Sequence, residues 1–330
     1  MRSNSSNLPL AIMLVLIVIL MSALNPRFLS VGNIVSMSYQ LPIIAILSIG
    51  MMLSILTGGI NLALIATSNF TGIVVALILK AMMGANTADA PIWVSLIALS
   101  GGLLAAILVG AVMGWLIGYL EIPAILATLG VMILINGVNL VLTKGYTISG
   151  FPPVILAMGN GTLGIVPIPF IILIGVCLLL AIMLNRTVFG RSLYATGTNP
   201  IAAQYSNLNV RSVLLRTYIL SACFSALAVF ITMGQLNSVK ANYTESYLLV
   251  AVLACFLGGI DPFGGTGKLS GLLLAVVILQ LISTGVNLLR LDPFLIQAMW
   301  GFIIILVLLV HFINDRVKDW RTAHKRPTSP

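Results

Sequence analysis

Long apolar runs alternate with short polar stretches from Leu8 almost to the C-terminus. Most runs approach the roughly 20 residues that an α-helix needs to cross the hydrocarbon core of a bilayer, and the eighth is short. We expect ten transmembrane helices, at residues 8–24, 41–57, 62–79, 92–120, 123–142, 168–184, 213–236, 246–260, 269–288 and 294–313. The pattern therefore predicts an all-α fold, a polytopic transmembrane helix bundle of about ten spans in one domain over residues 1–330.

The composition favours a membrane protein over a soluble one. Of 330 residues, 60% are hydrophobic and 7% are charged, and the mean hydropathy is +1.15. A soluble domain of this composition would lack a polar surface, whereas a membrane bundle exposes apolar side chains to lipid. The first run has no small-residue cleavage site before Asn25, so we expect an uncleaved helix rather than a signal peptide. Cys177, Cys223 and Cys255 lie in apolar runs without C-x-x-C spacing and are expected to be core residues.

One long polar stretch, residues 185–212, interrupts the apolar runs. Arginines flank it at positions 186, 191, 211 and 216, which favours retention on the cytoplasmic side of the membrane. Within it, Asn199 is suited to cap a helix and Pro200 to occupy the first turn. We therefore expect a short helix of about two turns, Ile201 to Leu208, on the cytoplasmic face.

The cations fix the expected orientation. With ten spans and a cytoplasmic N-terminus, the cytoplasmic segments hold Arg2, Arg186, Arg191, Arg211, Arg216, Lys268, Arg316, Lys318, Arg321, Lys325 and Arg326, and the external segments hold Arg27, Lys80, Lys144, Lys240 and Arg290. This imbalance places both termini, the 185–212 stretch and the 314–330 tail in the cytoplasm. It also explains the net charge of +9 as membrane orientation rather than nucleic-acid binding.

The sequence offers neither a catalytic constellation nor an energy source. Seven carboxylates and two histidines are scattered without a cluster, so an enzyme or a metal site is not expected. The segment Gly264 to Lys268 invites comparison with the phosphate-binding pattern G-x-x-x-x-G-K-[ST]. The pattern requires glycine where Pro262 stands and serine or threonine where Leu269 stands, so the chain does not match it. No Asp, Glu, Lys or Arg lies well inside the ten predicted spans, which argues against proton coupling. The energy for transport must come from another subunit, or the protein is a passive pore.

Uncharged polar residues remain as candidates for a path through the membrane. They are Asn61, Asn69, Thr128, Asn136, Gln280 and Asn287. Such residues commonly form hydrogen bonds between helices, and a minority of them lining a path for a neutral, hydroxylated solute is the functional interpretation. Glycines at 110, 114 and 118 predict close helix packing, and the glycine-rich segments 57–61 and 258–265 predict tight turns.

Five sequence blocks carry a resemblance to a known family. They are Asn25-Pro-Arg-Phe-Leu, Thr57-Gly-Gly-Ile-Asn-Leu, Ile122-Pro-Ala-Ile-Leu-Ala-Thr-Leu-Gly130, the polar stretch, and Leu257-Gly-Gly-Ile-Asp-Pro-Phe-Gly-Gly-Thr-Gly267. Together they resemble the membrane permeases of bacterial ATP-binding-cassette (ABC) importers, in the ribose and simple-sugar branch. The similarity extends from Asn25 to about His311. One departure is clear, since the family's usual Gly-Gly-Ile-Asp-Leu-Ser-Val-Gly-Ser is here Gly58-Gly-Ile-Asn-Leu-Ala-Leu-Ile-Ala66, without the carboxylate.

The resemblance implies a permease subunit in the inner membrane that imports a simple sugar and binds no cofactor itself. The implied partners are a second permease copy or paralogue, two cytoplasmic subunits that bind ATP, and a periplasmic or extracellular substrate-binding protein. The polar stretch would dock on the ATPase through Gly197, Asn199, Ala202, Ala203, Ser206 and Asn209. The alternatives are a nucleoside or signalling-sugar importer of the same superfamily and an ATP-independent channel or facilitator.

Overall fold

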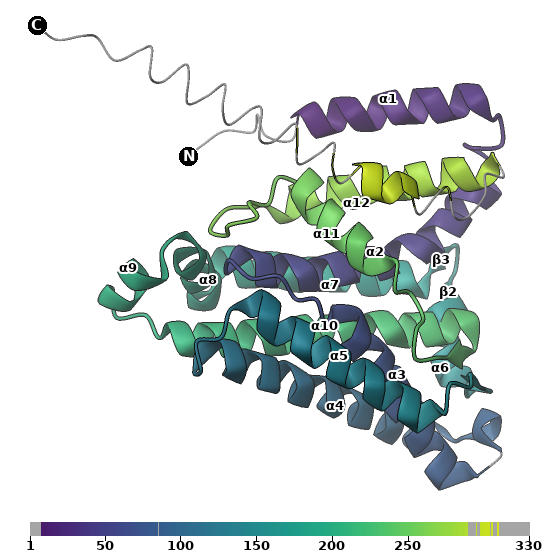
Figure 1. The fold of residues 1–330 in the computed structure, drawn as a ribbon. Helices are drawn as coiled ribbons and strands as arrows, with labels where there is room; N and C mark the ends of the chain where they lie inside the picture. Colours follow the sequence, from purple (N-terminus) through teal and green to yellow (C-terminus); the bar gives the residue numbers. More distant parts are fainter. Residues whose placement is uncertain are drawn as a thin grey trace, which may run out of the picture.

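The computed structural model describes residues 8–84, 86–289, 295, 298–303, 305 and 309. Long helices run side by side along one direction (Figure 1). The helices are α1 Leu8–Leu24, α2 Val31–Leu56, α3 Leu64–Met83, α4 Ile92–Gly118, α5 Ala124–Thr143, α6 Pro153–Asn160, α7 Ile168–Arg186, α8 Val188–Thr198, α9 Pro200–Tyr205, α10 Val210–Leu236, α11 Tyr247–Leu257 and α12 Leu269–Leu288, with a 3₁₀ turn, η2, at Thr87–Asp89. The predicted helical membrane bundle is confirmed.

The predicted number of spans is not confirmed. Within the described part of the chain, the helices long and apolar enough to cross a membrane are α2, α3, α4, α5, α7, α10 and α12. The predicted first and eighth spans form the shorter helices α1, of 17 residues, and α11, of 11 residues. The tenth predicted span, 294–313, lies mostly outside the described residues, and the tail at 314–330 lies outside them entirely.

Helix α2 is at the centre of the bundle. Every residue from Ile43 to Leu56 is buried, and α7, α10, α11 and α12 all pack against this half of the helix or beside it. The other half, before Pro42, is mostly exposed or half-buried. Proline lacks the N–H that an inner helix position donates, so Pro42 marks the boundary between a central core helix and a more polar outer part.

Helices α4 and α10 form a close contact through glycine. A Cβ atom built on Gly110 would lie 2.8 Å from the Cα atom of Ile219, and one on Gly114 would lie 2.6 Å from the Cα atom of Leu215. A Cβ atom built on Gly118 would lie 2.9 Å from the carbonyl oxygen of Arg211. The predicted glycine groove is therefore confirmed, and its partner is the backbone of α10.

The polypeptide between α10 and α12 does not cross the bundle as one continuous helix. After strand β4 (Ser238–Val239) the chain is non-helical until α11 begins at Tyr247, and α11 ends after 11 residues at Gly258-Gly259. Gly259 has a φ of 77°, in the left-handed region that stops a helix. Helix α11 lies within the predicted eighth span, residues 246–260, and is short because residues 241–246 before it form turns and the chain after it bends at Gly258-Gly259.

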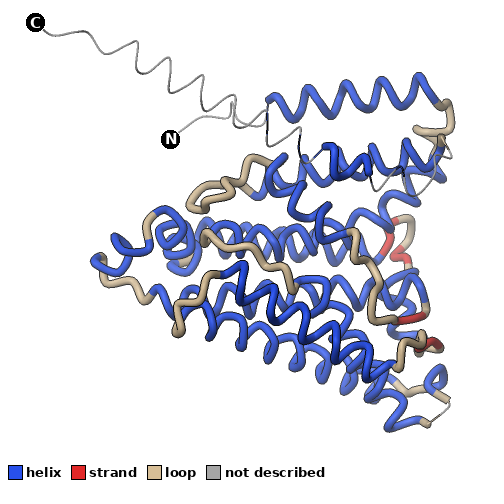
Figure 2. The backbone as a smooth tube through the Cα atoms, viewed as in Figure 1, coloured by secondary structure: helices blue, strands red, loops and turns tan. Residues whose placement is uncertain are grey.

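Four two-residue strands lie at one end of the bundle, at the right in Figure 2, away from α8 and α9. Strand β1 (Ile148–Ser149) pairs antiparallel with β4, with Ile148 opposite Val239. Strands β2 (Thr162–Leu163) and β3 (Val166–Pro167) form a small hairpin before α7. The two ends of the bundle thus differ, one carrying short helices and the other small β-ladders.

Candidate functional site

The polar stretch folds into two short helices whose starts are capped by its own side chains. Thr187 accepts a hydrogen bond from the Gly190 N–H at 3.2 Å and caps α8. Asn199 accepts from Ala202 N–H at 3.0 Å at the start of α9, where Pro200 occupies the first position. Asn209 accepts from Ser212 N–H at 3.0 Å and caps α10. The predicted cap and proline are confirmed, and Asn209 is a capping residue.

Helix α9 is shorter than the expected segment from Ile201 to Leu208, since it ends at Tyr205. Asn207 adopts a φ of 60°, its N–H bonds to the Gln204 carbonyl, and the Leu208 N–H bonds to the Ala203 carbonyl. These two bonds form a Schellman motif, in which a left-handed residue closes the helix. The sequence signal was the asparagine, which tolerates the left-handed conformation.

The surface of α9 differs from the expectation based on its small residues. Ala202 and Ser206 are exposed, but Ala203 is buried within this chain at 4% exposure. Ala203 is thus covered within this chain, and its contact with a partner stays a prediction. Ile201 and Tyr205, one helical turn apart, are 65% and 90% exposed. They form an apolar pair that sequence reasoning missed.

Four glycines meet where α8 contacts the end of α2 and the loop before α12. We call this cluster the glycine junction; it consists of Gly58, Gly197, Gly264 and Gly265. The Gly265 N–H donates to the Leu56 carbonyl at 3.0 Å, which joins the loop before α12 to the end of α2. A Cβ on Gly197 would overlap that carbonyl and the Gly265 nitrogen, and a Cβ on Gly264 would lie 2.6 Å from the Gly58 nitrogen. The two glycine-rich turns predicted from sequence therefore meet each other against α8.

A tyrosine strengthens this attachment. The Tyr194 hydroxyl, on α8, donates to the Gly267 carbonyl at 3.0 Å. Burial raises the pKa of the Tyr194 phenol above its ordinary value, so the donated proton is retained at physiological pH. Helix α8 thus contacts both the end of α2 and the loop that leads into α12.

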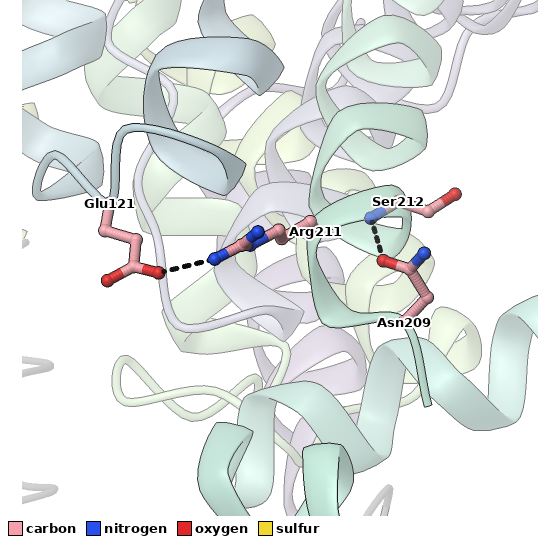
Figure 3. A network of polar contacts seen from close by, with 4 residues as sticks. All are labelled: Glu121, Asn209, Arg211 and Ser212. Carbon is pink, nitrogen blue, oxygen red and sulfur yellow. Dashed lines mark hydrogen bonds and ion pairs between the residues drawn. The ribbon is translucent and has the colours of Figure 1, made fainter. Parts of the chain in front are cut away.

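An ion pair crosses the same face of the bundle. The Arg211 guanidinium, at the start of α10, lies 3.4 Å from the carboxylate of Glu121, beside the Asn209 cap (Figure 3). Both side chains are more than half exposed. Exposed pairs of this kind contribute about 0–1 kcal/mol, so this pair adds little to the stability of the fold.

The predicted path residues nearest this end form hydrogen bonds between helices. Asn61 is fully buried, and its amide donates to the Ser221 hydroxyl at 2.9 Å, which in turn donates to the Gly50 carbonyl at 2.9 Å. Thr128 donates to the Ile60 carbonyl at 2.9 Å. A neutral amide suits this buried position, because an unpaired carboxylate there would be strongly destabilising. The asparagine that departs from the family pattern therefore links α3's entry loop to α10 and α2.

Asn69 has a structural partner of an unusual kind. Its buried amide nitrogen donates to two backbone carbonyls, those of Ala241 at 2.9 Å and Tyr243 at 3.0 Å. Both carbonyls belong to the non-helical turns, residues 241–246, that precede α11. Backbone at membrane depth must be satisfied within the protein when it is not helical, and Asn69 supplies that satisfaction.

The remaining predicted residues lie on α5 and α12. Asn136 is half-buried, and its side chain has no hydrogen bond to any described residue. Asn287 is exposed. Gln280 is 1% exposed and donates to Gln40 on α2 at 3.1 Å and to Thr284 at 3.2 Å. Gln40 was missed because it directly precedes the predicted second span. The structure does not bring all six candidates together, since they are divided between α3 with the loop before it, α5 and α12.

A cavity of about 730 Å³ lies between α2, α7 and α12. Its walls are mainly aliphatic, with Leu41, Phe170, Leu173, Cys177 and Val276 among them. Apolar walls do not match the hydroxyl groups of a sugar. Among the described residues, no group of three or more His, Cys, Asp or Glu could hold a metal ion.

Comparison with known proteins places the chain in a family. A family model described as "Branched-chain amino acid transport system / permease component" matches residues 33–311. The ribose import permease protein of Escherichia coli (strain K12) is 31% identical over 303 residues, 91% of each chain.

Other relatives have related names. The ribose import permease protein of Bacillus subtilis (strain 168) is 32% identical over 93% of this chain and 91% of its own. The galactose/methyl galactoside import permease protein of Salmonella typhimurium is 31% identical over 89% and 88%, and an autoinducer 2 import system permease protein of Klebsiella pneumoniae is 28% identical over 93% and 91%. No solved structure matches the chain. The chain is a membrane protein of the transport-system permease family.

Proposed function

We propose that this protein is the membrane permease subunit of an ABC importer that carries a simple sugar across the inner membrane. The observation that carries the proposal is the match to ribose and galactose permeases over nearly the whole chain. The α8–α9 segment supports it, because its exposed apolar pair is attached through the glycine junction to two core helices. ATP hydrolysis is assigned to a separate subunit.

The proposed assembly contains a second permease copy or a paralogue, two cytoplasmic ATPase subunits and an external substrate-binding protein. In it, α8 and α9 face the cytoplasm, as do both termini, and the chain crosses the membrane ten times. The eighth crossing is made by the turns at residues 241–246 together with α11, and the tenth by residues 294–313. The cation distribution supports this orientation.

The proposed docking residues are Ile201 and Tyr205. An apolar side chain exposed on a cytoplasmic helix gains about 1.5–3 kcal/mol when a partner removes it from water. Ile201→Glu should therefore release the ATPase subunit from the purified complex. Ile165→Glu is the matched control, since Ile165 is also an exposed isoleucine but lies beside β2–β3 at the opposite end of the bundle.

The test is affinity purification of the permease with its ATPase, followed by measurement of ATPase stimulation by the binding protein loaded with D-ribose or D-galactose. The proposal predicts that wild type and Ile165→Glu retain a stimulated ATPase and that Ile201→Glu loses it. If no ATPase co-purifies with wild type and solute uptake proceeds without ATP, the protein is a facilitator. The similarity to autoinducer 2 permeases makes a signalling sugar the second candidate substrate.

A further inference from the structure

Polar side chains form one face on the outer part of α2, the part before Pro42. Asn33, Ser36 and Gln40 are spaced at i, i+3 and i+7, which places them on one side of a helix. Ser36 and Gln40 are exposed, and Gln40 donates to the Ser36 hydroxyl at 3.2 Å.

Helix α12 carries a matching face. Gln280, Thr284 and Asn287 are spaced at i, i+4 and i+7. Seven residues separate the first and last of each set, so each face extends about 10 Å along its helix. Apart from Ser283, the rest of the middle of α12 is apolar, which makes this the polar side of the helix.

The two faces are joined at one end and aligned at the other. Helices α2 and α12 pack together with opposite chain directions. Gln280 donates to the Gln40 amide oxygen at 3.1 Å. At the far end, the Asn25 amide in the turn before α2 donates to the Leu288 carbonyl at 3.4 Å, so the start of α2 lies beside the end of α12. Asn33 therefore lies at the level of Asn287, and Ser36 at that of Thr284.

Hydrogen-bonding capacity remains unused along these faces. The Gln280 amide oxygen is buried and has no hydrogen-bond partner among the described residues. An unpaired buried carbonyl is destabilising by about 1–3 kcal/mol unless water or a ligand occupies its lone pairs. The exposed Gln40 and Asn287 amides would be similarly unfavourable against lipid.

We infer that the α2 and α12 faces line a water-filled passage for a neutral, hydroxylated solute, with the Gln40–Gln280 pair as its contact point with the solute. The inference rests on the proposed function and deepens it, since it locates the path. A carboxamide is suited to this role, because its oxygen accepts from a hydroxyl group and its nitrogen donates to one. Neither face carries a charged side chain, which suits a neutral solute.

The passage opens at the end of the bundle away from α8 and α9. The other ends of the same helices meet at the glycine junction, where Gly265 bonds to Leu56 and the loop leads directly into α12. A movement of α8 therefore acts on both walls of the passage. The neighbouring apolar cavity continues along the same side of α12 toward α8, where Leu273, Val276 and Val277 line it.

Thiol accessibility tests whether the faces are in contact with water. In a background with Cys177, Cys223 and Cys255 replaced by alanine, Ser36→Cys and Gln40→Cys should react with an impermeant, charged methanethiosulfonate reagent added outside intact cells. Ser38→Cys is the matched control, because the Ser38 hydroxyl bonds only to the Ile34 and Val35 carbonyls of its own helix and lies on its other side. The Ser38 variant should react much more slowly.

Leucine variants test whether the faces contact solute. Gln40→Leu and Gln280→Leu should each weaken the apparent affinity of uptake for D-ribose or D-galactose about tenfold, the equivalent of one lost hydrogen bond. Gln280→Leu should leave the thermal stability of the purified protein unchanged, since it also removes an unpaired buried oxygen. A purely structural glutamine would instead show lower stability with unchanged affinity.

The outcomes separate the passage from the proposed function. Unreactive cysteines at Ser36 and Gln40, or a disulfide between two copies through Ser36→Cys, would show a dry subunit contact and overturn the passage. Normal uptake by both leucine variants would overturn it as well. If the Ser36→Cys and Gln40→Cys variants react but the wild-type protein transports neither sugar with ATP, the passage stands and the proposed sugar importer is rejected.

Discussion

Gly197→Ala tests the glycine junction. Its added methyl group would overlap the Leu56 carbonyl and the Gly265 nitrogen, two backbone atoms that already bond to each other. Backbone atoms cannot rotate away as a side chain can, so the contact must open. Overpacking of this kind typically destabilises by about 1–3 kcal/mol. Alanine is also the better helix former by about 1 kcal/mol, so a net loss of up to about 2 kcal/mol is expected.

Gly137→Ala is the matched control. Gly137 is also a helical glycine, in α5, and a Cβ there would meet nothing within 4 Å. This variant should keep or slightly raise stability, because only the helix propensity changes. The contrast between the two variants isolates the close contact from the general effect of removing a glycine.

The assay is thermal unfolding of both variants in detergent, with sugar-stimulated ATPase activity of the complex as a second measurement. Gly197→Ala should unfold at a lower temperature and lose stimulation while the ATPase remains bound, since Ile201 and Tyr205 are unchanged. Equal stability and equal stimulation of the two variants would refute the reasoning that α8 transmits force through this junction.

Three further predictions concern single contacts. Asn69→Leu leaves the Ala241 and Tyr243 carbonyls unpaired and should destabilise by about 2–6 kcal/mol, measured as lost monodisperse protein on size-exclusion chromatography; wild-type behaviour would mean that water replaces the amide. Tyr194→Phe should destabilise by about 1 kcal/mol in thermal unfolding. Because burial raises the pKa of Tyr194 in the folded protein, its contribution to the free energy of unfolding is complete below the ordinary tyrosine pKa of about 10 and is lost as the pH rises above the raised pKa. A stability difference between wild type and Tyr194→Phe that already varied from pH 6 to pH 9 would contradict this assignment. Glu121→Gln should change stability by less than about 1 kcal/mol, and a larger loss would show that the Arg211 pair is shielded from solvent.

Helix positions could be predicted well because lipid-facing and core-facing helices are both apolar. The sequence pattern located α3, α4, α5, α7, α10 and α12 to within a few residues. It placed the start of α2 ten residues late, because the outer part of that helix is polar and mostly exposed. The same polarity that hid this part of α2 from a hydropathy argument makes it a candidate wall of the passage.

Contacts between distant segments could not be predicted. The glycine-rich turns at 57–61 and 258–265 were recognised, but nothing in local pattern indicates that they meet each other and Gly197. Asn69 was selected as a polar residue within a span, yet its partners are carbonyls that become free only because the chain before α11 forms turns instead of a helix. An asparagine that pairs with unwound backbone and one that faces a solute look identical in sequence.

The central claim, an ATP-driven sugar permease, is tested most directly in proteoliposomes. These should contain the permease and its ATPase subunit, with the binding protein outside and ATP inside, and accumulation of labelled D-ribose or D-galactose is measured over time. The account predicts accumulation above the external concentration that requires both ATP hydrolysis and the binding protein. Equilibration of either sugar without ATP, or accumulation by the permease alone, would contradict it.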